Sequence, residues 1–320
     1  MQTENLIFTN WRARCSSFGK LMTNLPSEEE SLKIVTEIKD LTNERDYGIN
    51  ANGNKVKWTE NKDNRLAFLL DKQNKGDELP TGAITYLEEV FRDKFWNRKR
   101  FLENKYLTKG TVCEEDALDL VSQRDNFFYR KNDEHIHNYF LQGTPDNLQK
   151  KIKDTKTSWD LESFEKAELT TLYEWQLKGY SWISHSYDFP ELETKTISEL
   201  DYCLVNAPYD LLMDELKQLQ WKHNVIDIDN PSEEFIEEAK QLERNMIFDI
   251  AKFKEEYPYY DFYSTILDFS IPPFMRNKSF NVTLTEDDIK HMTRRITMAR
   301  EWLVNKEKET LKQISNGWNN

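Results

Sequence analysis

Two aspartates and a lysine, close together in the sequence, are the residues with the clearest capacity for chemistry. Asp154 and Lys156 lie in the segment 150–157, KKIKDTKT, which has the pattern of a strand. Because strand side chains alternate between faces, these two side chains project from the same side. Asp146 follows Pro145 at the turn that we expect to enter this strand, which can bring a second carboxylate beside Asp154. Two carboxylates and one ammonium group are therefore expected to converge.

This set of donors predicts a divalent-cation site. Mg²⁺ and Mn²⁺ prefer hard oxygen ligands, usually keep several waters, and take one or two carboxylates together with phosphate oxygens of a substrate. We therefore expect Mg²⁺ as the cofactor, with Mn²⁺ able to replace it. The alternatives at this stage are an ordinary turn aspartate at position 146 and an exposed ion pair formed by Asp154 and Lys156.

Residues of two predicted helices could complete the site. Glu114 shares one helix face with apolar residues, so its carboxylate is expected to point toward the interior, where it needs a partner. The adjacent Glu115 is the alternative acid. In the aromatic helix predicted over 165–186, Gln176 and Tyr180 are spaced i, i+4 on one side. A neutral amide there can orient a lysine or a phosphate without adding charge.

The elements that must position these residues alternate between strands and helices. Apolar alternation predicts strands at 137–143, 150–157, 201–206 and 280–284. Helical spacing predicts helices at 80–96, after residue 110, and at 165–186, 210–221, 231–257 and from 285 onward. This order indicates a mixed α/β layer architecture, helix-rich at both ends. No segment has the composition of a linker, so we expect a single domain over 1–320, with a core at about 80–210, a helical segment at 1–79 and a helical extension at 210–320.

Charge and composition narrow the class of protein. The 320 residues include 57 acids and 44 bases, a net charge of −13, yet 13% are aromatic, which favours a packed core over disorder. The acidity is concentrated in 201–250, whereas 91–100, FRDKFWNRKR, is basic. A DNA-binding surface is therefore compatible with the sequence if that basic segment faces the site.

The number of cysteines and the length of the apolar runs exclude other classes of protein. Cys15, Cys113 and Cys203 lie far apart and are too few for a disulfide framework or a four-thiolate metal cluster within one chain. No apolar run approaches the length of a membrane span, and the start of the sequence has no pattern of a secretory signal. We therefore expect a cytoplasmic protein without a membrane partner. His135 and His137 could suggest zinc, but a solvent-facing loop is the preferred interpretation.

Four short motifs together resemble a known enzyme family. They are Gly110 with Glu114 and Ala117 in a G-x3-E-x2-A helix, Pro145-Asp146, Asp154-Thr155-Lys156, and Gln176-x3-Tyr180. In this order and approximate spacing they resemble the PD-(D/E)XK nuclease superfamily, and within it the lambda-exonuclease or YqaJ-like exonucleases of phage-type recombination. The segment from Arg14 to Met22 resembles the part of these enzymes that contacts DNA, and the likeness extends over about 15–210.

The resemblance implies a fold and a role for each matching residue. The fold would be α/β (α+β), with a restriction-endonuclease-like mixed central sheet flanked by helices. The implied metal ligands are Asp146, Asp154, the Thr155 carbonyl and Glu114, while Lys156 would position or activate the attacking water. Gln176 and Tyr180 would be an accessory pair.

DNA contacts are expected from two basic segments. Arg12 and Arg14 are candidates for the 5′-terminal phosphate, because an arginine fork can bind phosphate through two hydrogen bonds. Ser17 is a further candidate for a DNA contact. Arg98, Lys99 and Arg100 are candidates for the phosphate backbone, although a solvated helix face is the alternative.

The function implied by the family is a Mg²⁺-dependent DNA exonuclease that degrades linear double-stranded DNA from 5′ to 3′. Its product would pass to a single-strand annealing or single-strand-binding partner, and members of the family can form a ring around DNA. The alternatives are an endonuclease or single-strand-specific nuclease with the same residues, and a catalytically silent DNA-binding scaffold. Two departures from the family are Asp rather than Glu at position 154 and the acidic extension over 210–320, whose role the resemblance does not assign.

Overall fold

The computed structural model describes residues 6–23, 28–75, 78–100, 104–225 and 231–317. The chain divides into two compact units. One comprises Met1–Ala13, Ser17–Lys99 and Asp287–Asn320, and the other comprises Arg14–Ser16 and Arg100–Glu286. Among the described residues, no helix combines the length and the apolar character that crossing a membrane would require.

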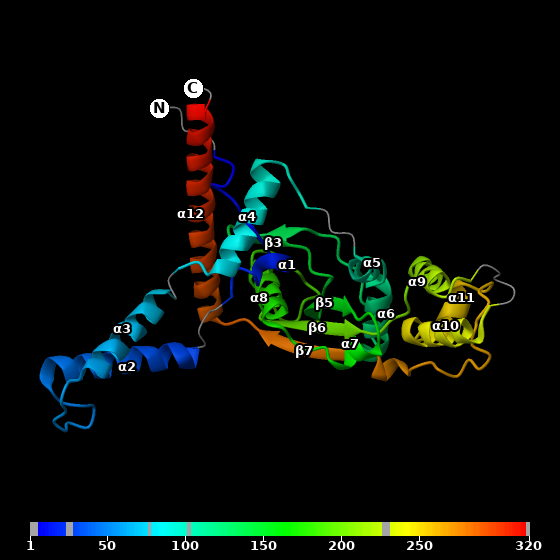
Figure 1. Cartoon of the computed structure of the whole chain (residues 1–320), viewed down its shortest axis with the longest axis horizontal. Coiled ribbons are helices and arrows are strands. Elements are labelled where there is room, and N and C mark those ends of the chain that lie inside the picture. The colour runs from blue at the N-terminus through cyan, green and yellow to red at the C-terminus, as the bar shows by residue number, and fades with distance from the viewer. Residues whose placement is uncertain (1–5, 24–27, 76–77, 101–103, 226–230, 318–320) are drawn as a thin grey trace. The chain divides into compact units, whose positions relative to one another are not determined.

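A four-stranded mixed sheet forms the centre of the second unit. Its strands, in spatial order, are β4 (Asn147–Gln149), β5 (Lys151–Thr157), β6 (Ile197–Cys203) and β7 (Asn277–Thr283). The strands β5 and β6 run parallel, and the two outer pairings are antiparallel. The neighbouring arrows of β5, β6 and β7 can be followed in Figure 1. Residues in the middle of β5 and β6 are buried, as expected for strands covered on both faces.

Helices α6 (Glu114–Asp125) and α8 (Thr171–Ser184) pack against β5 and β6. The side chain of Thr170 accepts a hydrogen bond from the Tyr173 backbone and thereby caps the start of α8. Helix α6 ends at Asn126, which adopts a left-handed conformation with φ 47°. Two shorter helices, α5 (Lys105–Val112) and α7 (Leu161–Glu165), precede α6 and α8 respectively.

A small sheet adjoins α8. It contains β1 (Ala13–Arg14), β3 (Leu141–Gly143) and β2 (Ile136–His137), in that order. Gly143 is required here, because a Cβ atom at this position would lie 2.7 Å from the ring of Tyr180. The absence of a side chain therefore lets α8 approach β3 closely.

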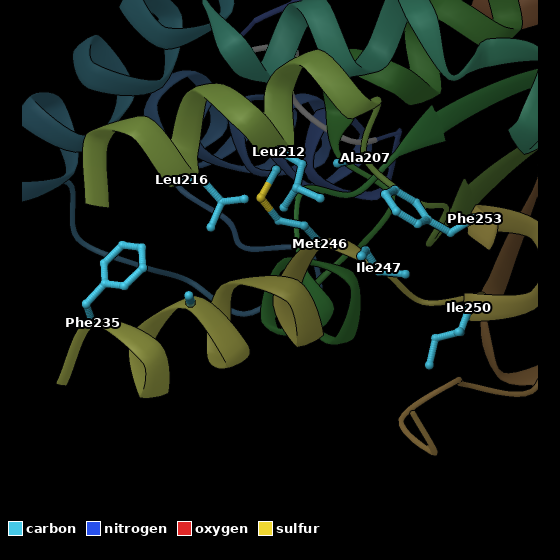
Figure 2. Packing of buried hydrophobic residues seen from close by; sticks show 9 residues of the cluster. Ala207, Leu212, Leu216, Phe235, Met246, Ile247, Ile250 and Phe253 are labelled. Carbon is cyan, nitrogen blue, oxygen red and sulfur yellow. The ribbon is translucent and has the colours of Figure 1, made fainter. Parts of the chain in front are cut away.

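The acidic extension contains its own hydrophobic cluster within the second unit. Helices α9 (Tyr209–Lys222), α10 (Glu233–Met246) and α11 (Ile250–Glu256) enclose it. Figure 2 shows Leu212, Leu216 and Met246 between α9 and α10. The short 3₁₀ helix η1 (Pro273–Met275) then leads the chain back into β7.

The first unit is helical. It contains α2 (Glu28–Tyr47), α3 (Glu60–Lys75), α4 (Thr81–Phe95) and nearly all of α12 (Glu286–Gly317), while α1 (Cys15–Phe18) lies where the chain passes from one unit to the other. The buried Glu307 of α12 accepts hydrogen bonds from the backbone of Ile7 and Phe8 at 2.9 and 3.2 Å. These bonds satisfy a buried carboxylate and fix the start of the described chain against α12.

The predicted fold class is confirmed, since a mixed sheet is flanked by helices and both ends are rich in helix. Several predicted boundaries are wrong, among them the start of the aromatic helix, which lies at Thr171 and not near residue 165. The expected strand at 137–143 is a hairpin of β2 and β3, because Asn138 Oδ1 accepts backbone hydrogen bonds from the turn. The strand expected at 201–206 already begins at Ile197. The helix expected over 231–257 breaks before Asp249, whose side chain caps α11.

Candidate active site

The register of the sheet brings Asp146 and Asp154 together. In the antiparallel pairing of β4 with β5, Asn147 is opposite Lys153. Asp146, one residue earlier, therefore comes opposite Asp154, one residue later. Lys156 donates a hydrogen bond to Asp154, as expected for neighbours on one strand face. The structure thus brings these three residues together.

The backbone and hydroxyl of Thr155 hold the carboxylate of Asp146. Asp146 Oδ2 accepts from Thr155 N at 2.6 Å and from Thr155 Oγ1 at 2.9 Å. Asn132 fixes the preceding turn, because its side chain donates to the Pro145 carbonyl and its backbone donates to the Asp146 carbonyl, both at 2.8 Å. The turn is therefore anchored on both sides, and the position of Asp146 is defined.

Asp154 is almost fully buried, with 2% of its surface exposed. Its Oδ1 accepts from Gln176 Nε2 at 2.8 Å, while Oδ2 accepts from Lys156. Gln176 Nε2 also lies 3.2 Å from the hydroxyl of Tyr180, and both of these helical side chains are buried. Of the i, i+4 pair predicted from the sequence, Gln176 therefore contacts Asp154 from α8, and Tyr180 contacts Gln176.

The electrostatics show an excess of buried negative charge. Burial and then the charge of Asp154 raise the pKa of Asp146 to about 6, although Lys156 and Thr155 oppose the shift. Burial also raises the pKa of Asp154, against the lowering effect of Lys156. Burial alone would lower the pKa of Lys156, but the two aspartates outweigh it and raise that pKa. The site is therefore one at which an added cation would be favoured.

Glu114 lies beside this cluster, but not where the sequence places it. Its side chain is partly exposed and forms an ion pair with Lys131 at 3.1 Å, so the expectation that it points into the apolar interior is wrong. Glu114 is the first residue of α6, where a side chain can turn back from the apolar face of the later turns. Burial and the charge of Asp146 raise the pKa of Glu114, whereas Glu115 is exposed.

The residues expected to contact DNA are mostly exposed. Arg14 is exposed and directly precedes Cys15, whose side chain packs against Gly143 and Gly179 in the same unit. Arg100 of this unit is also exposed. In the other unit Arg98 and Lys99 are exposed, and Arg12 and Ser17 are partly buried. Within the second unit, neither Arg14 nor Arg100 takes part in the hydrogen bonds described around Asp154.

The donor set fits Mg²⁺ in the way that this ion is usually bound by proteins. Asp146 and Asp154 supply two carboxylates with raised pKa values, and Mg²⁺ commonly takes one or two carboxylates plus waters and substrate phosphates. Among the described residues, no three His, Cys, Asp and Glu side chains are arranged as a ready-made metal cage. His135 and His137 are exposed, and His137 lies in β2 and not in a loop as expected.

Three neighbours of the site were not identified from the sequence. Asn132 anchors the turn of Asp146, Lys131 pairs with Glu114, and the ring of Tyr173 lies 5.3 Å from the Lys156 ammonium. The first two are in an irregular segment without periodicity, so sequence pattern carried no signal for them. Tyr173 precedes Gln176 by three residues, and helical spacing already places it on the face of Gln176 and Tyr180, although without a role in the site.

Comparison with known proteins identifies the fold. No protein-family model matches the sequence. No curated protein matches it either. The structure is similar to that of a phage related exonuclease from Haemophilus somnus 129PT, with a TM-score of 0.56 and 19% sequence identity, over 94% of this chain and 97% of that chain. The expected likeness to phage-type exonucleases is therefore confirmed at the level of the fold.

Two weaker similarities are to an alkaline exonuclease. One is LHK-Exo from Laribacter hongkongensis, with a TM-score of 0.44 and 8% identity over 74% of this chain and 87% of that chain. The other is LHK-Exo in complex with dAMP, with a TM-score of 0.45 and 9% identity over 97% of this chain and 96% of that chain. The assignment of the fold rests on the first structure alone.

Proposed function

We propose that this protein is a metal-dependent deoxyribonuclease, specifically an exonuclease that degrades linear double-stranded DNA from 5′ to 3′. The observation that carries the proposal is the convergence of Asp146, Asp154 and Lys156, with Gln176 behind them, in a fold shared with a phage related exonuclease. The polarity, the role in phage-type recombination and a single-strand annealing or single-strand-binding partner follow from the family resemblance.

Each residue has a distinct part in this proposal. Mg²⁺ held by Asp146, Asp154, the Thr155 carbonyl and Glu114 would lower the pKa of a water and neutralise charge on the phosphate. Lys156 would orient the attacking water and hold a proton near the scissile phosphate, because its ammonium group already donates a hydrogen bond to Asp154 in the site. Gln176 would keep the Asp154 carboxylate in one orientation.

Glu114 is the better candidate than Glu115 for the helical acid. The charge of Asp146 raises the pKa of Glu114, which requires the two carboxylates to be close. Glu115 is exposed. The interaction of Glu114 with Lys131 would weaken when a cation binds between the acids.

Digestion of DNA with defined ends tests the proposal. Purified protein with Mg²⁺ is expected to release nucleotides from linear duplex and to leave covalently closed circles intact, and EDTA should stop the reaction. Release of label from the 5′ end before the 3′ end would support the stated polarity. Cleavage of closed circles would establish an endonuclease instead. If the protein digests no DNA with either Mg²⁺ or Mn²⁺, the nuclease proposal is rejected, and a DNA-binding scaffold is the remaining alternative.

A further inference from the structure

A pocket of about 490 Å³ opens beside the candidate active site, within the second unit. Its volume lies in the range of sites that bind small organic groups. Thr157 and Trp159 of its wall follow Lys156 at the carboxyl end of β5, and Tyr106 of α5 and Tyr202 of β6 form other walls. In open α/β sheets this end of parallel strands is where ligands bind.

A continuous row of side chains joins the pocket to the acidic cluster. The Lys156 ammonium, which bonds Asp154, lies over the ring of Tyr173. The ring centroid of Tyr173 is 6.2 Å from that of Tyr202, which lines the pocket. A strand whose scissile phosphate lies at Asp154 would run along this row toward the pocket.

The chemistry of the walls favours an aromatic, partly polar group. Tyr106 and Trp159 form an edge-to-face pair with centroids 5.0 Å apart, and Tyr106 remains 54% exposed. Aromatic side chains of this kind stack on unpaired bases irrespective of sequence. Among the described residues, the hydroxyl oxygen of Thr157 in the pocket wall is buried without a hydrogen-bond partner, so it would need a small rotation to pair with a polar edge of the occupant.

The nearby cations are less suited to hold a phosphate, because each is already engaged. Lys109 donates to the carbonyls of Ser158 and Trp159 at 2.8 and 3.0 Å. Lys105 pairs with Glu215 at 2.9 Å, and Lys166 pairs with Glu162. The acid Glu168 also lines the pocket. Stacking, rather than charge, is therefore the main attraction that the pocket offers.

We propose that this pocket binds an unstacked nucleobase of the strand that is cut, next to the scissile phosphate. The proposal rests on the proposed nuclease function and adds a consequence to it. A base inside a duplex is stacked on both sides, so the strand must leave the helix near the site before the base can enter the pocket.

Binding without hydrolysis tests the pocket separately from catalysis. The probes are a short single-stranded oligonucleotide with a fluorescent label at one end and a matched strand of the same number of phosphates with abasic residues. Fluorescence anisotropy is measured with Ca²⁺ in place of Mg²⁺ to avoid cutting. Wild-type protein is expected to bind the base-bearing strand about 10-fold more tightly than the abasic strand.

Two variants and one control assign that preference to the pocket. Tyr106→Ala and Trp159→Leu should weaken binding of the base-bearing strand about 10-fold and leave binding of the abasic strand unchanged. The control is Trp221→Ala, which removes a tryptophan that is 83% exposed on α9 and should change neither affinity. Trp159 also packs against the hydrophobic cluster of α9, α10 and α11, so thermal melting is used to check that the Trp159→Leu variant is folded. If the Trp159→Leu variant is unfolded, the result for Tyr106→Ala decides, because Tyr106 is exposed.

Equal loss of affinity for both strands, or no loss for either, in Tyr106→Ala would overturn the pocket assignment. A base preference that Tyr106→Ala abolishes, in a protein that digests no DNA with Mg²⁺, would keep the pocket and reject the nuclease. If the wild-type protein digests DNA but shows no base preference, the nuclease function is kept and the pocket assignment is rejected.

Discussion

Strands β5 and β6 carry buried charges on both faces of the sheet, and the two faces differ in their charge balance. On one face Lys153, 1% exposed, lies among Glu199 and Asp201, and Arg124 of α6 pairs with both acids. On the other face Asp154 is paired with Lys156 and receives Gln176 from α8. The same two strands thus hold one network facing α6 and another facing α8.

The pKa values move in opposite directions on the two faces. Burial would raise the pKa of Glu199, but Lys153 and the other cations outweigh it and lower that pKa to about 2. Burial and the charge of Asp154 raise the pKa of Asp146 to about 6. A buried network with matched charges is stabilising only as a whole, whereas an excess of acid is costly until a cation joins it. Charge balance therefore distinguishes the face that holds the fold together from the face suited to chemistry.

The largest expected effect is that of Asp154→Asn on activity. The substitution removes a proposed metal ligand but keeps the shape of the side chain, so the rate should fall by roughly 10³–10⁴-fold. The free energy of unfolding without divalent cations should fall by less than about 1 kcal/mol, because Asp146 and Lys156 remain as a balanced pair. Nuclease assays and urea titrations measure the two effects. A large loss of stability with full activity would contradict the assignment of this face.

Lys153→Met should have the opposite effect. Among the described residues, Lys153 is the one lysine of that network that is almost fully buried. Without it Glu199 and Asp201 lack positive charge, so the free energy of unfolding should fall by about 3–5 kcal/mol. The rate per folded molecule should stay within the same order of magnitude. The matched control is Lys151→Met, a partly exposed partner of Glu199, which should cost about 1 kcal/mol or less. Equal losses for the two lysines would show that burial does not matter here.

Gln176→Leu tests the support of the chemical face. The variant leaves Asp154 Oδ1 without its donor, so the carboxylate is less well oriented, and we expect a 10- to 100-fold loss of rate or of metal affinity. Steady-state kinetics at several Mg²⁺ concentrations separate these two losses. Gln176→Glu adds a charge to a cluster that already has an excess of acid and should be worse. If both variants had the rate and metal affinity of the wild type, the Gln176 amide would have no role beyond packing.

The smallest effect concerns acid stability. A folded pKa of about 2 for Glu199 means that its contribution is fully present above its unfolded value near 4.5 and is lost as the pH falls from there toward 2. Glu199→Gln should therefore reduce the free energy of unfolding by roughly 1–3 kcal/mol at pH 7 and by much less near pH 3. Denaturant titrations at the two pH values measure the difference. A deficit that does not change with pH would point to lost packing instead of lost charge.

The sequence was sufficient to predict the elements that carry the chemistry, because their patterns are local. The alternation in 150–157 placed Asp154 and Lys156 on one face, and the helical spacing placed Gln176 beside Tyr180. The start of β6 was missed because the charged Glu199 interrupts the apolar pattern before Asp201, where the predicted strand begins. Their charges are tolerated there only because Lys153 and Arg124 reach them from β5 and α6.

Contacts between distant segments could not be predicted. Glu114 pairs with Lys131 instead of pointing into the apolar interior, and the Asn132 contacts with the turn before β4 join segments more than ten residues apart. The pocket beside Trp159 likewise combines α5, the end of β5 and β6. Such arrangements depend on tertiary packing and leave no periodic pattern in the sequence.

The position of a bound metal is the most direct test of the account. A crystal of the protein soaked with Mn²⁺ should show an anomalous peak at about 2.1 Å from carboxylate oxygens of both Asp146 and Asp154, and the peak should disappear in Asp154→Asn. A peak bound elsewhere, or no peak at these carboxylates at millimolar Mn²⁺, would contradict the claim that this face of the sheet is built to hold a divalent cation.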